Sequence, residues 1–227
     1  ENLVIGRCRM STVREQYLEA IGITVWSQRN FDENKTLIPD LSQQGWDELK
    51  ITVEDCTRCE LCHGRTQTVF GVGDHGADLL IIGEAPGVEE DQRGEPFVGR
   101  AGQLLDAMLS SIHLSRNKVY IANILKCRPP NNRDPKPKES LTCGPYLERQ
   151  ISLLQPKVIL ALGRIAAQWL LKSDSPVGRL RGGEFNYGEQ QIPLLVSYHP
   201  AYLLRSPSAK SKAWEDLILV MQILQNS

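Results

Sequence analysis

A short apolar strand that ends in a turn bearing an acid is the first feature of this chain that could carry chemistry. Residues 79–82 are all Leu or Ile, and the next five residues are Gly83, Glu84, Ala85, Pro86 and Gly87. In an open α/β sheet, ligands bind beyond the carboxyl ends of the strands, so we expect this turn to line a crevice. Carboxylates at Glu89, Glu90 and Asp91 and the ring of Phe97 follow within a few residues. The pattern predicts a site with several acids and one aromatic ring at a strand end.

The cysteines form a second chemical pattern. Cys56 and Cys59 make a C-x2-C pair, and Cys127 and Cys143 flank a loop rich in proline and basic residues. Four thiolates can close a metal site, and both zinc and an iron–sulfur cluster accept four cysteines. Cys62 extends the pair to a C-x2-C-x2-C run of ferredoxin appearance. The spacing favours a metal site over unlinked buried thiols, but it does not choose the metal.

The elements that must position these residues follow βαβ spacing. Apolar, β-branched runs recur at residues 79–82, 119–122, 158–162 and 194–197, and the segments between them are long enough for helices. Helical periodicity is found at residues 102–112, 139–154, 165–171 and 210–224. We therefore predict an α/β fold: a three-layer α/β/α sandwich around a four-stranded parallel sheet.

Length and charge limit the remaining possibilities. A chain of 227 residues fits one sizeable domain with an appendage, and a net charge of -1 gives no overall attraction to nucleic acid. With neither a signal-peptide pattern nor an apolar run of about 18 residues, we expect a cytoplasmic protein with no membrane partner. Residues 30–44 are polar and resemble a linker. The predicted organisation is an N-terminal amphipathic segment and linker, 1–45, and a folded domain, 46–227.

Several motifs, taken in order, resemble the family 4 uracil-DNA glycosylases, the iron–sulfur branch of their superfamily. The likeness covers roughly residues 53–220. Its motifs are the C-x2-C pair followed by GRT at 64–66, GEAPG at 83–87, GEPFVGRAG at 94–102, NILKCRPP at 123–130 and HPAYLLR at 199–205. The resemblance implies a monomeric enzyme whose domain, 46–227, hydrolyses uracil from uracil-containing DNA and leaves an abasic site.

The resemblance also implies a 4Fe-4S cluster. Its ligands would be Cys56, Cys59, Cys127 and Cys143, which leaves Cys62 and Cys8 outside. The cluster would be structural and would fix the loop at 128–137, whose basic residues could bind phosphates. These are Arg128, Arg133 and Lys136, with Lys138 just beyond. The alternative is that this loop is merely solvated.

The pocket residues would then read a base that has left the stack. Phe97 is the candidate stacking ring. Asn123 ends its strand, and its amide matches the N3–H and O4 of uracil, whereas cytosine has the opposite polarity there. His199 precedes Pro200 at a helix start, a position that favours a neutral ring donating to uracil O2 as the base becomes an anion.

The family also orients an attacking water, although a dissociative reaction demands less of a base. The better-known uracil-DNA glycosylases carry an Asp in the first turn, and Ala85 stands at that place here. We therefore expect Glu84 to position the water, with Glu90 as the alternative. Glu90 is also expected to occupy the space of a thymine methyl group, unless it is a solvated acid at a helix start. Leu204 or Arg205 would fill the vacated place in the base stack.

The N-terminal segment has a separate resemblance. Residues 17–29 are similar to the start of the psi subunit of the bacterial DNA polymerase III clamp loader. That likeness implies that residues 11–29 bind the clamp loader, with Trp26 as an exposed anchor and residues 30–44 as a tether. In the alternative interpretation, Trp26 packs on the surface of its own protein.

Two other functions compete with catalysis. The chain could be a DNA-binding protein without turnover, or a uracil-trapping relative that forms an adduct with DNA, tethered in either case to the clamp loader. Intact Glu84, Asn123 and His199 argue against lost catalysis, and the extra basic loop of the trapping branch is not found. A redox protein that uses the cluster is the remaining alternative.

Overall fold

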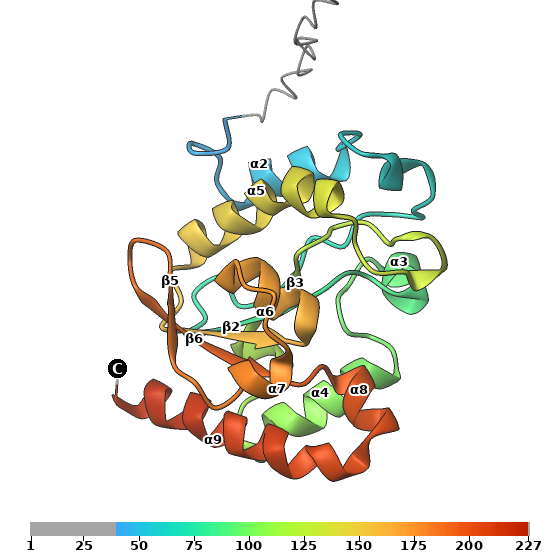
Figure 1. Ribbon diagram of the computed structural model, residues 1–227. Helices are drawn as coiled ribbons and strands as arrows, with labels where there is room; N and C mark the ends of the chain where they lie inside the picture. The colour runs from blue at the N-terminus through green and yellow to red at the C-terminus, as the bar shows by residue number, and fades with distance from the viewer. Residues whose placement is uncertain (1–39, 227) are drawn as a thin grey trace, which may run out of the picture. The chain divides into compact units, whose positions relative to one another are not determined.

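A six-stranded mixed sheet is the frame of the computed structural model, which describes residues 40–226 (Figure 1). In that part of the chain the strand order is β1-β3-β2-β4-β6-β5. The bounds are β1 Val72–Gly73, β2 Leu79–Gly83, β3 Tyr120–Asn123, β4 Val158–Leu162, β5 Phe185–Tyr187 and β6 Ile192–Ser197. The α/β prediction is confirmed, and the four predicted strands are the central parallel ones, β3, β2, β4 and β6.

Two antiparallel edge strands were not predicted. β1 pairs with β3 and β5 pairs with β6. β1 has two residues and β5 has three, and none of them is fully buried. Such short, partly exposed strands lack the apolar run that marks the central four, every residue of which is buried except Pro193.

Strand register brings the ends of the central strands together. Gly83 of β2 lies opposite Asn123 of β3, and Leu162 of β4 lies opposite Ser197 of β6. The turns that follow β2, β3 and β6 therefore meet at one edge of the sheet, as expected for parallel strands.

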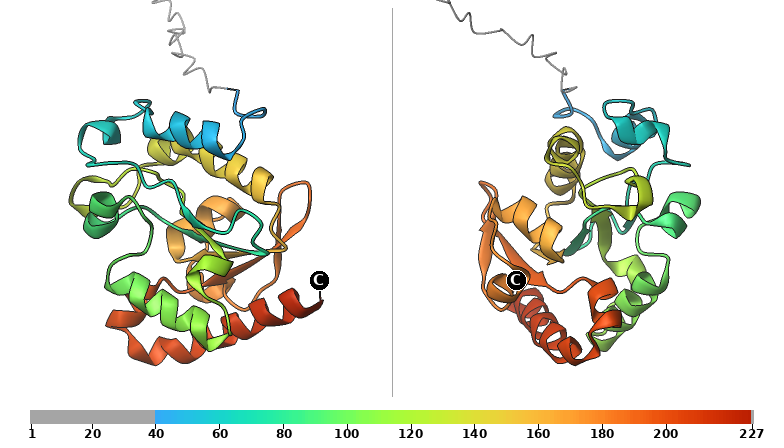
Figure 2. Two further views of the ribbon diagram at one scale, coloured as in Figure 1. Left: turned by 180° about the vertical axis from the view of Figure 1, so that it is seen from behind. Right: turned by 45° about the vertical axis from the view of Figure 1, so that its right-hand side comes forward.

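Helices cover both faces of the sheet (Figure 2). The helices α2, α5, α6 and α7 pack on one face, and α4, α8 and α9 pack on the other. Their bounds are α2 Trp46–Glu54, α3 Val88–Arg93, α4 Arg100–Ser111, α5 Pro137–Leu154, α6 Arg164–Leu171, α7 Val177–Leu180, α8 Pro200–Arg205 and α9 Lys210–Asn226. Short 3-10 turns lie at η1 Glu60–His63, η2 Arg116–Lys118, η3 Pro130–Asn132 and η4 Pro207–Ala209.

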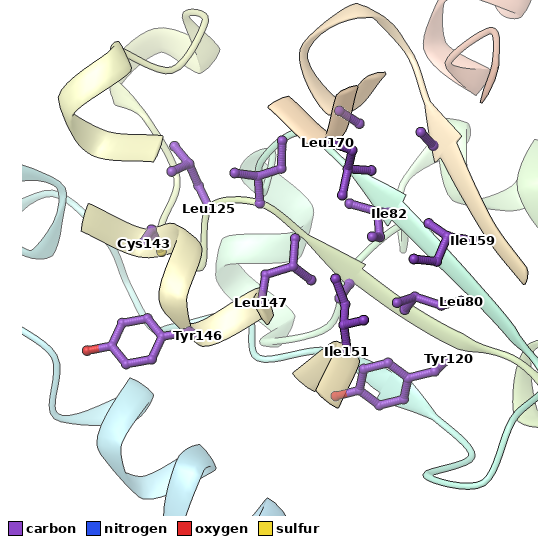
Figure 3. Packing of buried hydrophobic residues seen from close by; sticks show 14 of the residues in the cluster. Leu80, Ile82, Tyr120, Leu125, Cys143, Tyr146, Leu147, Ile151, Ile159 and Leu170 are labelled. Atoms are coloured by element: carbon purple, nitrogen blue, oxygen red, sulfur yellow. The ribbon is translucent and has the colours of Figure 1, made fainter. Parts of the chain in front are cut away.

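Alternate strand residues supply the two halves of the core. Leu80 and Ile82 of β2 face α5, where Leu147 and Ile151 point at them (Figure 3). Leu79 and Ile81 face the opposite way, into the cluster under α4 and α9. This alternation fixes which way β2 faces, because a shift of one residue would exchange the two faces.

Nowhere in residues 40–226 is a helix both long enough and apolar enough to cross a bilayer. The N-terminal segment at 11–29 and most of the expected linker at 30–44 lie outside the described residues, so their structure stays a prediction.

Candidate active site

A pocket of about 480 Å³ opens at the carboxyl edge of the sheet. Its walls come from the turn after β2, the start of α4, the end of β3, the loop before α5, and α8 with the residue before it. Most of the sequence-predicted pocket residues line it together: Glu84, Ala85, Glu90, Phe97, Asn123, His199 and Arg205. The volume is typical of small-ligand sites and exceeds what one pyrimidine fills.

Gly83 allows two of these side chains to lie close to the end of β2. A Cβ atom at this position would be 2.4 Å from Asn123 Oδ1 and 2.7 Å from Phe97 Cζ. Any larger residue would have to displace the amide or the ring. The backbone of β2 therefore forms the floor against which Phe97 and Asn123 rest.

Asn123 presents an unusual buried oxygen to the pocket. The residue is 2% exposed, and among the described residues its Oδ1 has no hydrogen-bond partner. Its main-chain carbonyl, by contrast, accepts a hydrogen bond from Lys126 Nζ at 2.9 Å. A buried acceptor without a donor costs about 1–3 kcal/mol, and a ligand N–H would offset that cost.

The tautomer of His199 follows from its own backbone contacts. His199 is the N-cap residue of α8, and its Nδ1 accepts a hydrogen bond from the Ala201 N–H at 3.1 Å. Because Nδ1 is an acceptor, the proton of the neutral ring lies on Nε2. Burial lowers the pKa of His199 to about 4; the charge of Arg205 lowers it further and that of Glu90 opposes the shift. The ring is therefore a neutral donor through Nε2.

Glu84 is shifted in the other direction. Burial raises its pKa to about 7, with the Asp134 carboxylate raising it and the Arg164 guanidinium lowering it. Asp134 and Arg164 form an ion pair of 2.5 Å at the pocket mouth. Glu84 is thus close to half-ionised at neutral pH, which suits a group that holds or receives a proton.

Both oxygens of Glu90 are engaged with backbone N–H groups. Oε2 accepts from Gly87 at 3.1 Å, and Oε1 accepts from Val98 at 2.9 Å and from Gly99 at 3.1 Å. Instead of being solvated, this carboxylate joins the start of α3 to the segment that leads into α4. Three donors leave it little capacity to hold a water molecule, which favours Glu84 for that role.

The residues expected to contact DNA are divided between the pocket and its surroundings. Arg205 lines the pocket, whereas Arg128 and Leu204 do not. Arg128 Nε donates to Asn132 Oδ1 at 2.7 Å, and Leu204 is 37% exposed. Arg133 lines the pocket too, but its guanidinium is held by Glu139, with distances of 2.9 and 2.6 Å.

Some pocket residues were missed by sequence reasoning. Asn132 and Asp134 line the mouth, and so does Tyr202, which is 40% exposed and stacks on Tyr198. The HPAYLLR run contained Tyr202, so an exposed aromatic one turn after His199 could have been identified. Asp134 carried no such signal, because its place depends on the path of a loop.

The four predicted metal ligands lie together. Cys56, Cys59, Cys127 and Cys143 line one cavity, and Cys62, which was expected to lie outside, lines it as well. None of these five forms a disulfide. Within residues 40–226, no three His, Cys, Asp or Glu side chains are arranged to hold a single metal ion.

Two of the sulfur atoms accept hydrogen bonds, but burial favours their neutral thiols. Arg65 Nη1 donates to Cys127 Sγ at 3.0 Å, and the Lys126 backbone N–H donates to Cys143 Sγ at 3.3 Å. Burial raises the pKa of Cys127 to about 11 and that of Cys143 to about 12. Thiolates here would therefore need a bound cation, and soft sulfur donors that share one cavity fit an iron–sulfur cluster.

Comparison with known proteins shows the family of the chain. The sequence matches the Uracil DNA glycosylase superfamily over residues 70–218. It is 42% identical over 176 residues to a Type-4 uracil-DNA glycosylase of Archaeoglobus fulgidus. The aligned region covers 75% of this chain and 88% of that protein. A Type-4 uracil-DNA glycosylase of Thermotoga maritima is 43% identical over 159 residues, with 69% and 81% covered. A Type-5 uracil-DNA glycosylase of Thermus thermophilus is 36% identical over 151 residues, with 58% and 68% covered.

Proposed function

Because the chain belongs to the uracil-DNA glycosylase superfamily and within it to the Type-4 enzymes, we propose that its pocket excises uracil from DNA through Glu84, Asn123 and His199. The reaction is hydrolysis of the N-glycosidic bond of uracil in DNA, giving free uracil and an abasic site, and it serves DNA repair. The enzyme is a glycosylase, and its substrate is uracil-containing DNA.

The unpartnered Oδ1 of Asn123 is the observation that carries the base assignment. It would accept the N3–H of uracil while the amide nitrogen donates to O4. Cytosine has an acceptor at N3 and a donor at N4. The amide oxygen of Asn123 would then face another acceptor, and its amide nitrogen would face another donor. Phe97, which is 5% exposed beside Asn123, supplies the face on which the flipped base stacks.

His199 stabilises the leaving base. Its only ring proton lies on Nε2, because Nδ1 accepts from the Ala201 N–H, and this proton would be donated to the base. When the bond from C1′ to N1 breaks, both electrons stay with uracil, and negative charge gathers on O2. A preorganised donor aimed at that oxygen is typically worth about 10²–10³ in kcat.

Glu84 orients the water that completes hydrolysis. Its carboxylate accepts a hydrogen bond from water, which adds to the oxocarbenium-like C1′ and then loses a proton to that carboxylate. Ala85, the next residue, lines the uracil pocket and cannot do this. Glu90 remains the alternative base, although its three backbone donors favour a positioning role that also excludes a thymine methyl group.

DNA would be held at the pocket mouth. Arg205, which lines the pocket, or the neighbouring Leu204 on α8 would enter the base stack, and Arg128 would bind a phosphate. Arg133 contributes to the shape of the mouth through its pair with Glu139, so we do not assign it a phosphate.

A 4Fe-4S cluster would be held by Cys56, Cys59, Cys127 and Cys143. The fit rests on soft donors that share one cavity and on the N–H groups directed at two of the sulfur atoms. When bound, the cluster would supply a structural cross-link. It would join the chain after α2 to the loop after β3 and to α5.

The remaining parts of the proposal concern the whole protein. Residues 46–227 would form the glycosylase domain of a cytoplasmic monomer, and residues 11–29 would bind the DNA polymerase III clamp loader, with residues 30–44 as a tether. A peptide of residues 11–29 should then bind purified clamp loader, and Trp26→Ala should abolish that binding. If the peptide does not bind, the tether is excluded.

The test of the function uses oligonucleotides with one uracil, single-stranded or double-stranded, and alkali cleavage of the abasic product. We expect the wild-type protein, purified without oxygen, to cleave. His199→Ala and Asn123→Ala should each lose about 10²-fold or more in rate. Asn186→Ala, on the exposed edge strand β5, is the matched control and should keep full activity. A wild-type protein that binds uracil-DNA without turnover would instead be a binding or uracil-trapping protein.

A further inference from the structure

The backbone of Phe97 adopts a conformation that needs support. Its φ is +54°, in the left-handed region that residues other than glycine rarely adopt. The segment around it, Pro96 to Gly99, joins α3 to α4 and carries the ring into the pocket. A strained residue of this kind persists only where its surroundings hold it.

Arg116, at the start of η2, supplies that hold from one side. Its guanidinium donates to the main-chain carbonyls of both Pro96 and Phe97, with 3.0 Å from Nη1 to the Phe97 oxygen. Glu90 holds the same segment from the other side, because it accepts the N–H groups of Val98 and Gly99. Two side chains of opposite charge therefore bind four consecutive residues.

Neighbouring features keep Arg116 in place. Its side chain is 23% exposed, and Asp106 of α4 accepts from it at 3.3 Å. On the other side of the segment, a Cβ at Gly102 would lie 1.7 Å from the Phe97 oxygen, so the helix fits closely against that carbonyl. The Phe97 carbonyl oxygen therefore lies close to the backbone of α4 while it accepts from Arg116.

The position of the ring depends on this arrangement. The Phe97 ring lies against Gly83 and stacks with His199, with 5.4 Å between ring centroids at an angle of 28°. We propose that Arg116 is a positioning residue for uracil excision, which holds the Phe97 backbone so that its ring meets the base beside Asn123 and His199. The inference rests on the proposed function of Phe97 as the stacking ring.

The expected effect falls on the bound base rather than on DNA binding. Arg116→Met removes both donors, so the ring is free to move, and we expect kcat to fall about tenfold while KM for the oligonucleotide stays within about twofold. The inhibition constant of free uracil should rise by a similar factor, about tenfold. Arg116→Lys can reach one carbonyl but not both and should recover part of the loss.

A double-mutant cycle separates the inference from the function. Phe97→Leu removes the stacking face and should lower kcat about 10- to 100-fold. If Arg116 acts through Phe97, Arg116→Met adds little to Phe97→Leu, because the ring it positions is absent. Multiplied effects in the double variant would overturn the inference. A fully active Phe97→Leu would instead overturn the proposed role of the ring.

A separate control variant distinguishes lost positioning from lost stability. Lys157→Met removes a cation from an ion pair with Asp78 at the opposite edge of the sheet and should leave kcat and uracil inhibition unchanged. If Arg116→Met does not fold, the cycle is run with Arg116→Lys. A variant at Arg116 that unfolds at the wild-type urea midpoint and keeps the wild-type inhibition constant for uracil contradicts the proposal.

Discussion

Two residues at the pocket, Glu84 and His199, have pKa values shifted in opposite directions. These shifts determine how the excision rate should depend on pH. Glu84 has its pKa raised to about 7, and His199 has its pKa lowered to about 4, mainly by burial in each case. Between pH 5 and 8, Glu84 titrates while His199 stays neutral. Burial therefore separates the pKa of the proposed water-binding acid from that of the proposed donor to the base.

The first prediction is that kcat falls at acid pH, and that protonation of Glu84 causes this acid limb of the pH–rate profile. As pH falls below about 7, the carboxylate gains a proton and loses its capacity to accept from water, so kcat should fall up to tenfold per pH unit. Glu84→Gln should be slower and should show no such limb. Excision rates from pH 5 to 9 measure this. An unchanged limb in Glu84→Gln would assign the titration to another group.

The second prediction concerns stability and the same residue. Its folded pKa lies above the ordinary value of 4.5, so the folded state binds the proton more tightly, and stability falls as pH rises from about 4.5 to 7. Glu84→Gln removes this cost and should raise the free energy of unfolding by about 1 kcal/mol at pH 8, a value reduced for partial solvent exposure. Near pH 5 the gain should nearly vanish, as urea titrations at both values can check.

At the scale of elements, the end of β2 sets the geometry of the pocket. Gly83→Ala would place a methyl group 2.4 Å from Asn123 Oδ1 and 2.7 Å from Phe97 Cζ. We expect excision to fall at least tenfold, because the amide and the ring must both shift. The matched control is Gly45→Ala at the start of α2, where a Cβ meets nothing within 4 Å. Equal activity in the two variants would contradict this account of β2.

Sequence reasoning predicted these elements to different degrees. The central strands and the long helices were predictable because burial imposes a period of two or 3.6 on their residues. The edge strands β1 and β5 carry no such period. The Glu84 turn and Asn123 were located because parallel strands end together, whereas the contacts of Glu90 and Arg116 depend on distances between separate elements, which periodicity does not encode.

For the whole molecule, the cysteine site and the pocket share one loop. Cys127 lies at its beginning and Cys143 lies in α5 beyond its end, while Asn132 and Asp134 between them line the pocket mouth. Fewer than ten residues of chain therefore separate either cysteine from the pocket mouth, so we expect a change at the sulfur atoms to affect the mouth. Asn123 and His199, by contrast, come from the ends of β3 and β6, which the sheet holds independently of this loop.

Loss of the proposed cluster should consequently weaken DNA binding more than chemistry. Oxidation with a chelator, or Cys127→Ser, should remove visible absorbance and iron and lower the thermal midpoint by about 6–12 °C, which corresponds to about 3 kcal/mol for a domain of this size. KM for the oligonucleotide should rise about tenfold, while kcat at saturating DNA stays within a few-fold.

Cys62→Ser should retain iron, since the four other thiols suffice. Full iron content in Cys127→Ser together with iron loss in Cys62→Ser would exchange the two ligands and overturn the assignment.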